Sequence, residues 1–264
     1  MPQCPNPSGP GICKHIHMKP GKIHIGTSGW SYKDWKEIFY PEKMKSTDWL
    51  SFYAQSFDCT EINTSFYHMP LAQTVQNWVE KVPARFKFCP KISRYLTHMK
   101  KLLDPEEPLQ RFFEVFAQVK KHLGPVLIQL PPSLGFKAER TTHFFEVLKT
   151  TYKAYDFALE VRHNSWLTSE AYALMKKYNI AFVISQSGAG FPYAEEVTAK
   201  HIYVRFHGPK KLYASLYTEN MMREYAEKIS NWQKAGHDVW VFFNNDFYGY
   251  GIDNARQLLA LTGK

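Results

Sequence analysis

Apolar and polar residues alternate in eight short segments along the chain. The first, residues 23–28, reads Ile-His-Ile-Gly-Thr-Ser and leads directly into Gly29 and Trp30. Alternation with a period of two is typical of a β-strand that buries one face. The other seven segments follow the same design, and they are residues 58–63, 86–91, 126–130, 157–162, 180–185, 202–207 and 239–244. The pattern therefore predicts eight strands.

Segments with helical periodicity separate most of these strands. They are residues 47–57, 71–81, 106–123, 139–151, 169–178, 219–235 and 252–261. Only residues 186–200, between the sixth and seventh strands, lack a clear helical pattern. Eight strands that alternate with helices predict an α/β fold, a (β/α)8 TIM barrel, built as a single domain from residues 23–264. A doubly wound open sheet is the alternative. The first turn of such a fold usually has the spacing G-x-G-x-x-G, and residues 26–29 do not have it.

The first 22 residues are rich in Pro, Gly and Lys, and we predict an irregular N-terminal extension over residues 1–22. This stretch contains Cys4, Cys13, His15 and His17. Their spacing matches none of the usual zinc sites, so a plain tail is the favoured interpretation and zinc binding stays open as the alternative.

Composition narrows the class of protein. With 264 residues, 44% of them hydrophobic and 16% aromatic, the chain has the composition of a globular protein. A formal net charge of +9 favours anionic partners, although charge alone is weak evidence. The start of the sequence has no secretory pattern, and no apolar run approaches the ~20 residues of a membrane span. We expect a cytoplasmic protein with reduced thiols and no membrane partner.

The alternation also indicates which side chains point into the barrel. In the segment 157–162, the large residues Phe157, Leu159 and Val161 share one face, which leaves Glu160 and Arg162 on the other. The same reasoning turns a set of polar residues inward near the ends of the strands, where barrel enzymes have their active sites. These residues are Ser28, Glu61, Asn63, Lys91, Gln129, Glu160, Arg162, Ser185, Arg205, His207 and Asn244. Cys59 and Cys89 lie earlier in their strands and are predicted to be core. A purely structural pair of Glu160 with Arg162 is the alternative for that strand.

The inward residues suggest how the site works. The cations Lys91, Arg162 and Arg205 outnumber the carboxylates Glu61 and Glu160, so we expect a small anionic ligand, phosphorylated or sugar-containing. Beside Arg162, Glu160 should stay ionised. The candidates for catalysis are thus Glu61, Glu160 and His207, with His207 favoured because its ordinary pKa lies near neutrality.

Aromatic residues follow several strand ends, where they are suited to stack on a sugar or a base. Together with the inward polar residues they complete the predicted substrate-binding set, which is Ser28, Trp30, Tyr32, Asn63, Tyr67, Lys91, Gln129, Arg162, Trp166, Arg205, Asn244 and Asn245. A metal bound by Glu61, Glu160, His207 and Asp246 is the alternative. Because three cations surround that set and no H-x-x-x-H pattern occurs, we predict neither a metal nor another cofactor.

A series of motifs resembles the YecE-like family, also called domain of unknown function 72. The motifs are residues 26–32 (GTSGWSY), 39–41 (FYP), 61–67 (EINTSFY), 91–94 (KISR) with Thr97-His98, 129–132 (QLPP), 160–163 (EVRH) with Ser165-Trp166, 204–208 (VRFHG) and 243–245 (FNN). The resemblance covers residues 23–261 and implies a TIM barrel with the motif residues at its catalytic face, but no particular reaction. The extension before Gly21 has no counterpart in the family, and Asp246 stands where the family pattern suggests a histidine.

Three hypotheses about function follow. The first is an enzyme, a hydrolase, lyase or isomerase, that acts on a small anionic ligand by acid and base chemistry without a metal. The second is a nucleic-acid binding or processing barrel, in which the same cations contact backbone phosphates. The third is a non-catalytic ligand-binding protein. The sequence leaves the substrate and the oligomeric state open.

Overall fold

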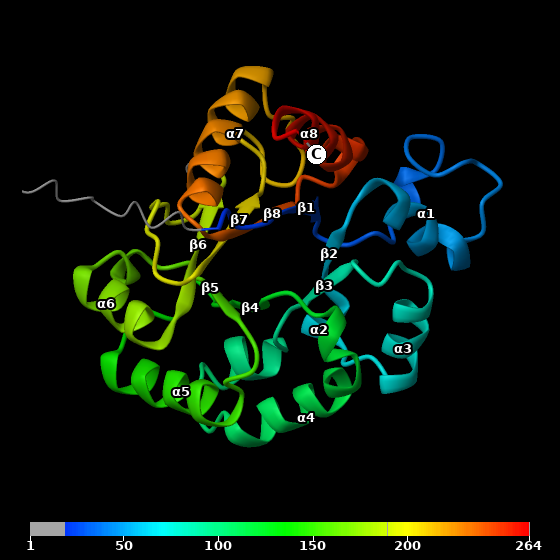
Figure 1. Ribbon diagram of the computed structural model, residues 1–264. Coiled ribbons are helices and arrows are strands. Elements are labelled where there is room, and N and C mark those ends of the chain that lie inside the picture. The colour runs from blue at the N-terminus through cyan, green and yellow to red at the C-terminus, as the bar shows by residue number, and fades with distance from the viewer. Residues whose placement is uncertain (1–18, 189, 264) are drawn as a thin grey trace, which may run out of the picture.

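Eight parallel strands form the centre of the molecule, and helices surround them (Figure 1). The computed structural model describes residues 19–188 and 190–263, which make up one domain. The strands are β1 (Ile23–Thr27), β2 (Cys59–Ile62), β3 (Lys87–Pro90), β4 (Val126–Gln129), β5 (Phe157–Glu160), β6 (Ile180–Gln186), β7 (His201–Phe206) and β8 (Asp238–Phe243). All eight predicted strands are therefore confirmed, and so is the TIM barrel.

The helices fall where the periodicity predicts them, with a few short additions. They are α1 (Trp49–Ser56), α2 (Thr64–Tyr67), α3 (Ala72–Glu80), α4 (Glu106–Phe116), α5 (Ala138–Thr151), α6 (Ser169–Tyr178), α7 (Glu219–Lys234) and α8 (Tyr250–Leu261). The short α2 and a π-helical turn at Tyr95–Met99 were not predicted, because segments of one turn are too short to show a helical period. The helix predicted over residues 106–123 ends at Phe116 and continues as a 3₁₀ turn at Ala117–His122.

Local capping explains the sharp limits of α6. The side chain of Thr168 accepts a hydrogen bond from the backbone N–H of Ala171, which satisfies one free donor of the first turn. Asn179 follows the helix in the left-handed conformation (φ 56°), a geometry that asparagine tolerates better than most residues. The chain then enters β6 directly at Ile180.

The barrel is closed firmly on most of its circumference and loosely at one seam. Strand order is β3-β2-β1-β8-β7-β6-β5-β4, with parallel pairing throughout. The end strands β3 and β4 meet through two isolated bridges, Phe88 with Leu123 and Lys91 with Leu127. A hydrogen bond of 2.9 Å from the backbone N–H of Ile92 to the carbonyl of Leu127 adds to this seam. The sheet is therefore nearly closed between β3 and β4.

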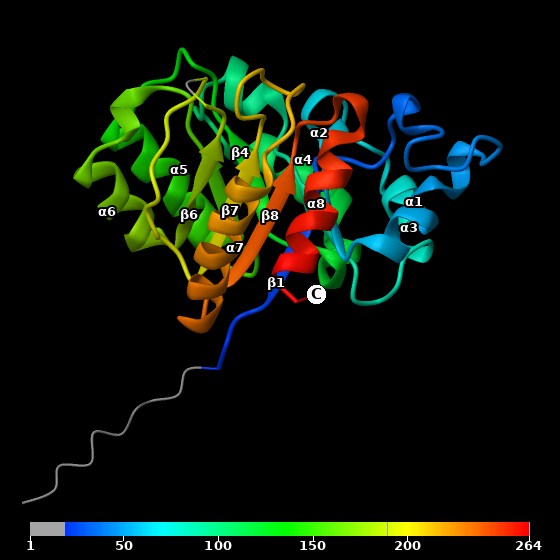
Figure 2. The same ribbon diagram turned by 90° about the horizontal axis from the view of Figure 1, so that it is seen from above.

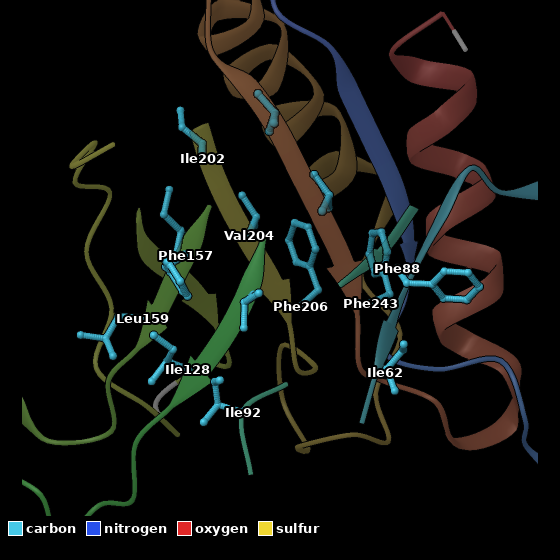
Figure 3. Close-up of a cluster of buried hydrophobic side chains, with 14 of the residues drawn as sticks. Ile62, Phe88, Ile92, Ile128, Phe157, Leu159, Ile202, Val204, Phe206 and Phe243 are labelled. Carbon is cyan, nitrogen blue, oxygen red and sulfur yellow. The ribbon is translucent and has the colours of Figure 1, made fainter. Parts of the chain in front are cut away.

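Two apolar layers confirm the predicted register. The outer layer lies between the sheet and the helices, and Figure 3 draws part of it, including Ile128, Leu159 and Val204. The inner layer fills the barrel and contains Cys59, Cys89, Leu127, Ala158, Ala181, Val183, Tyr203, Trp240 and Phe242. Both cysteines are buried, as predicted for core residues. One face of each strand thus supports the helices while the other fills the interior.

The strands point toward the same end of the molecule, where the long connecting loops gather (Figure 2). The described chain enters at the opposite end, where the backbone N–H of Gly21 donates to the carbonyl of Gln233 at 2.9 Å. Cys4, Cys13, His15 and His17 lie outside the described residues, so their predicted role is not tested. None of the helices in residues 19–188 and 190–263 has the length and apolarity that a membrane crossing requires.

Candidate functional site

A cavity of about 570 Å³ opens at the carboxyl ends of the strands. Its wall is formed by Tyr32, Asn63, Phe66, Tyr67, Lys91, Arg94, His98, Gln129, Arg205, Tyr213 and Asn244. Seven of these were predicted to bind substrate, and they come from the ends of β1, β2, β3, β4, β7 and β8. Among the described residues, the wall includes three cationic side chains and no carboxylate. This cavity is the candidate active site.

Below the cavity, Arg205 joins two carboxylates that come from distant strands. Its Nε donates to Oε1 of Glu61 at 2.9 Å, its Nη2 donates to Oε2 of Glu61 at 2.8 Å, and its Nη1 donates to Oε2 of Glu160 at 2.6 Å. Burial lowers the pKa of Arg205, but the charges of Glu160 and Glu61 outweigh burial and the net shift is upward. Because its charge is matched by two carboxylates, Arg205 is less available to an anion than the sequence suggested.

Glu160 is the most heavily bonded carboxylate of this network. Besides Arg205, its Oε1 accepts hydrogen bonds from Nη2 of Arg162 (2.8 Å), the hydroxyl of Ser185 (2.8 Å) and Nε2 of His207 (2.7 Å). Burial would raise its pKa, yet the charges of Arg162 and Arg205 and the bond with His207 hold the pKa of Glu160 well below its ordinary value. Glu160 is thus ionised, as predicted.

His207 has both ring nitrogens occupied. Its Nε2 donates to the ionised Glu160, which leaves Nδ1 to accept from the amide Nδ2 of Asn244 at 3.0 Å. Burial lowers the pKa of His207 to about 4, although the charge of Glu160 acts in the opposite direction. Desolvation therefore outweighs the bond to Glu160, and His207 does not keep the near-neutral pKa for which the sequence favoured it in proton transfer. It holds Asn244 at the cavity wall.

Lys91 is a buried cation of the cavity wall, and its contacts are with neutral groups. Its Nζ donates to Oε1 of Gln129 at 2.8 Å and lies 4.1 Å from the centre of the Phe66 ring. It forms no ion pair with any residue of the described chain. Burial, followed by the charge of Arg205, lowers the pKa of Lys91 to about 7. The backbone carbonyl of Lys91 accepts from the hydroxyl of Ser65 at 2.7 Å, which fixes the end of β3 against α2.

A comparison with known proteins identifies the family to which this barrel belongs. The family model described as "Protein of unknown function DUF72" matches residues 24–264. The chain belongs to the DUF72 family. The DUF72 protein is 27% identical over 269 residues to the UPF0759 protein YunF of Bacillus subtilis, which covers 90% of this chain and 94% of YunF. It is also 27% identical to the UPF0759 protein YecE of Escherichia coli over 142 residues, or 53% of this chain and 48% of YecE.

Solved structures agree with this assignment. A crystal structure of a DUF72 family protein from Thermotoga maritima matches with a TM-score of 0.80 and 28% identity, and it covers 92% of this chain and 100% of that one. A DUF72 family protein from Enterococcus faecalis matches with a TM-score of 0.79 over 92% of this chain and 96% of that one. At 22% identity the second comparison shows the fold alone. The names of these four relatives do not state a reaction.

Asp246, where the family resemblance suggests a histidine, has an unusual environment in this DUF72 protein. Burial raises the pKa of Asp246 to about 8. Its Oδ2 lies 3.0 Å from the hydroxyl of Tyr32, and that hydroxyl also lies 2.7 Å from the carbonyl of Ser28. The Tyr32 hydroxyl has one proton to donate, and it lies within hydrogen-bond distance of both acceptors. No cluster of metal-ligating side chains exists among the described residues, Asp246 included.

A second cavity of about 400 Å³ adjoins the first near the end of β1. Its wall includes Trp30, Trp78, Ser28 and Glu61, and it shares Tyr32 and Asn63 with the larger cavity. The side-chain amide of Asn63 donates to the carbonyl of Ser28 at 2.7 Å, which ties these two strand ends together. Of the three residues predicted for catalysis, Glu61 reaches a cavity wall, whereas Glu160 and His207 lie in the network below.

Three predicted substrate-binding residues line neither cavity, and they are Trp166, Asn245 and Arg162. Trp166 is buried in the outer apolar layer, where it packs on Phe136 and its Nε1 donates to the carbonyl of Leu134 at 2.9 Å. Asn245 is buried, and its Nδ2 donates to the carbonyl of Ser215 and to Oδ1 of Asn254. Both side chains hold loops in place, so the structure does not bring either of them to the candidate site.

Arg162 lies beside the network instead of in the cavity wall. Its Nη2 bonds to Glu160, and its guanidinium carbon lies 3.3 Å from the centre of the Phe191 ring. The buried Nε and Nη1 atoms have no hydrogen-bond partner among the described residues. Four wall residues, Phe66, Arg94, His98 and Tyr213, were absent from the predicted set. Arg94 and His98 belong to the family motif after β3, which was the available signal for them.

Proposed function

We propose that this DUF72 protein is an enzyme that binds a small anionic substrate, phosphorylated or sugar-containing, in the 570 Å³ cavity at the carboxyl end of the barrel. The observation that carries the proposal is the separation of charges at this site. Lys91, Arg94 and Arg205 line the cavity, while the carboxylates Glu61 and Glu160 are bonded to Arg205 beneath it. An anion entering the cavity meets cations before it meets a carboxylate.

Lys91 attracts an anion to the cavity through its positive charge. Two unit charges 4 Å apart interact by about 4 kcal/mol at an effective dielectric constant of about 20. A bound anion supplies the counter-charge that Lys91 does not have in the described chain, and it therefore stabilises the ammonium form. Arg94, which is exposed at the rim, adds attraction that salt screens.

Proton transfer in this proposal belongs to groups in the cavity wall. Lys91 has a pKa of about 7, and a proton donor or acceptor works best when its pKa lies near the working pH. Glu160 and His207 position Arg205 and Asn244, since all their polar atoms are bonded inside the network. The chemistry in this proposal uses no metal.

The test is a screen of phosphorylated and sugar-acid metabolites by thermal shift, followed by assays for conversion. At least one anion is expected to raise the melting temperature of the wild type and not that of Lys91→Met. Lys149→Met, at an exposed position of α5, is the matched control and should behave as the wild type. If no anion stabilises the wild type, or if Lys91→Met responds equally, the proposal fails. Stabilisation without conversion of any bound compound indicates a ligand-binding protein instead.

A second candidate function has its own support. Twelve large apolar side chains are exposed among the described residues, and all twelve lie in segments that follow a strand's carboxyl end. They are Ile38, Tyr67, Met69, Leu71, Tyr95, Met99, Leu103, Tyr193, Tyr213, Leu216, Phe247 and Tyr248. Aromatic side chains near cations are suited to stacking with unpaired bases, which favours single-stranded nucleic acid as the alternative partner.

Fluorescence anisotropy with labelled oligonucleotides distinguishes this alternative. Binding through phosphates weakens steeply as salt increases, and loss of a stacking aromatic costs about 1–3 kcal/mol. Tyr67→Ala and Tyr248→Ala should each weaken binding in this case. Absence of binding at low salt excludes the nucleic-acid function.

A further inference from the structure

The amine of Lys91 is held by neutral groups although it is buried. The oxygen of the Gln129 amide accepts from it at 2.8 Å, and the Phe66 ring covers it at 4.1 Å. By contrast, the Nζ of Lys100 lies 3.0 Å from the carboxylate of Asp104. An amide oxygen and a ring face stabilise an ammonium less than a carboxylate does, so these contacts offset the cost of burying the charge only in part.

Two guanidinium groups lower the pKa of Lys91 further. Arg205 and Arg162 both lower the pKa of Lys91 through their positive charges, whereas the charges of Glu160 and Glu61 raise it; together with burial the net shift is downward. Each guanidinium is anchored to Glu160, so neither can move away from the site without breaking a buried bond. A lysine that is desolvated and placed beside other cations becomes a nucleophile near neutral pH.

The cavity gives this amine room and orientation. Lys91 forms part of the wall of the 570 Å³ cavity, together with the cation Arg94 and the phenols Tyr67 and Tyr213. Its backbone is fixed from both sides, because the Ser65 hydroxyl donates to its carbonyl at 2.7 Å and its N–H lies 3.2 Å from the carbonyl of Ile62. The nucleophile is thus held at the end of β3 and faces a space that admits a small molecule.

We propose that Nζ of Lys91 forms an imine with the carbonyl carbon of a small anionic aldehyde or ketone bound in this cavity. The inference rests on the proposed function, because it assumes that the cavity receives the anionic substrate, and it narrows the substrate to a carbonyl compound. In the first step the lone pair of Nζ attacks the carbonyl carbon. The electron pair of the C=O bond moves to oxygen, which takes a proton, the nitrogen releases one proton, and a neutral carbinolamine results.

In the second step water leaves. The hydroxyl takes a second proton and departs as water while the nitrogen lone pair forms the C=N bond, which gives a protonated imine. Loss of the one proton left on nitrogen gives the neutral imine, so the amine and the carbonyl compound yield an imine and one water. Tyr67 and Tyr213 are the wall hydroxyls that can pass protons to and from the departing oxygen. A protonated imine withdraws electrons from the adjacent carbon, which favours loss of a proton or a carbon group there. The reaction class is therefore a lyase or an isomerase.

The inference is tested by reductive trapping. The full chain is incubated at pH 7 with pyruvate and sodium cyanoborohydride, and the modified lysines are located by peptide mass mapping. Lys91 should be modified at least about ten-fold faster than the exposed Lys149 in the same sample. Its pKa is lowered to about 7, so a larger share of its amine is unprotonated at pH 7. Lys149→Met should leave trapping at Lys91 unchanged.

Gln129→Glu provides a variant that keeps the lysine. A carboxylate in contact with Nζ raises the pKa of Lys91, so trapping should fall about ten-fold at pH 7 and recover as the pH is raised. Lactate, which has the carboxylate of pyruvate but no carbonyl, reports anion binding separately. Lactate that protects Lys91 or raises the melting temperature, together with no adduct at Lys91, overturns the imine and leaves the anion proposal standing. An adduct that neither lactate nor sulfate slows leaves the imine standing and overturns the anion proposal.

Discussion

Arg205 of β7 and Glu61 of β2 form two parallel hydrogen bonds, of 2.9 and 2.8 Å, across the inside of the barrel, although β8 and β1 lie between their strands in the sheet. The same guanidinium reaches Glu160 of β5 on the other side at 2.6 Å. One side chain therefore connects three strands near their carboxyl ends. This link beneath the cavity leads to the first prediction.

Glu61→Gln should lower the free energy of unfolding by about 3 kcal/mol, because it leaves a buried guanidinium with one carboxylate in place of two. Urea denaturation measures the change. The matched control is Glu196→Gln, which breaks an exposed pair with Lys176 at 3.7 Å and should change stability by less than about 0.5 kcal/mol. Equal stability of Glu61→Gln and wild type would contradict a structural role for the Arg205 pairing.

His207 should make the fold more sensitive to acid. Its pKa is lowered from 6.5 to about 4 by burial, so between these values the unfolded chain binds a proton that the folded chain does not. Stability from this residue is fully present above pH 6.5 and is lost as the pH falls toward 4, by at most about 3 kcal/mol. His98 and His201 also have lowered pKa values, so the measurement is the difference between wild type and His207→Asn. A slope of stability against pH that is the same in both proteins would refute the prediction.

Asp246 should make the fold less stable as the pH rises, which is the opposite of the effect of His207. Burial raises its pKa from 3.8 to about 8, so between these values the folded chain holds a proton that the unfolded chain has released, and stability falls as the pH rises. Asp246→Asn keeps a side-chain oxygen that can accept from Tyr32 and has no charge to bury, so it should be more stable than wild type at pH 8 by about 1–3 kcal/mol. Denaturation at pH 5 and pH 8 measures the difference. Asp34→Asn, at an exposed site, should change stability equally at both values.

Lys91 should couple anion binding to proton uptake. Sulfate is the probe, because it does not titrate in this range. With a pKa of about 7 in the free protein, Lys91 must gain a proton to bind an anion above pH 7, so affinity should fall by up to about ten-fold per pH unit there. Lys91→Arg stays protonated, and its affinity should be flat from pH 6 to 9. Calorimetry in two buffers with different ionisation enthalpies detects the proton that the protein takes up when sulfate binds. Proton uptake that persists in Lys91→Arg would assign it to another group.

Substitution of Trp166 should affect mainly the stability of the fold, whereas substitution of Tyr67 should affect mainly ligand binding. Trp166→Phe removes a buried hydrogen bond and part of a buried ring, so it should cost about 1–3 kcal/mol of stability and leave ligand affinity unchanged. Tyr67 is 63% exposed at the cavity, so Tyr67→Ala should weaken ligand binding with little change in stability. Denaturation and ligand titration of both variants make the comparison. The opposite pattern would show that Trp166 contacts the ligand after all.

Much of this architecture was predictable from local patterns. Alternation within each strand depends only on backbone geometry, so it correctly turned Cys59 and Cys89 into the barrel and Leu159 and Val204 toward the helices. The same rule brought Glu61, Lys91, Glu160 and Arg205 to one end of the molecule. It did not indicate the one-turn helix at Thr64–Tyr67, which sets Phe66 against Lys91.

The amino-acid sequence by itself determined the eight strands, their buried faces and the kinds of side chain that gather at their carboxyl ends, because each of these follows from residues that are close in the chain. Only the tertiary structure decided which charges neutralise each other. Arg205 reaches carboxylates 144 and 45 residues away in the chain, which leaves Lys91 with an amide and a ring as its partners. Pairing and desolvation depend on distances across the barrel, and those distances are set by how the sheet closes.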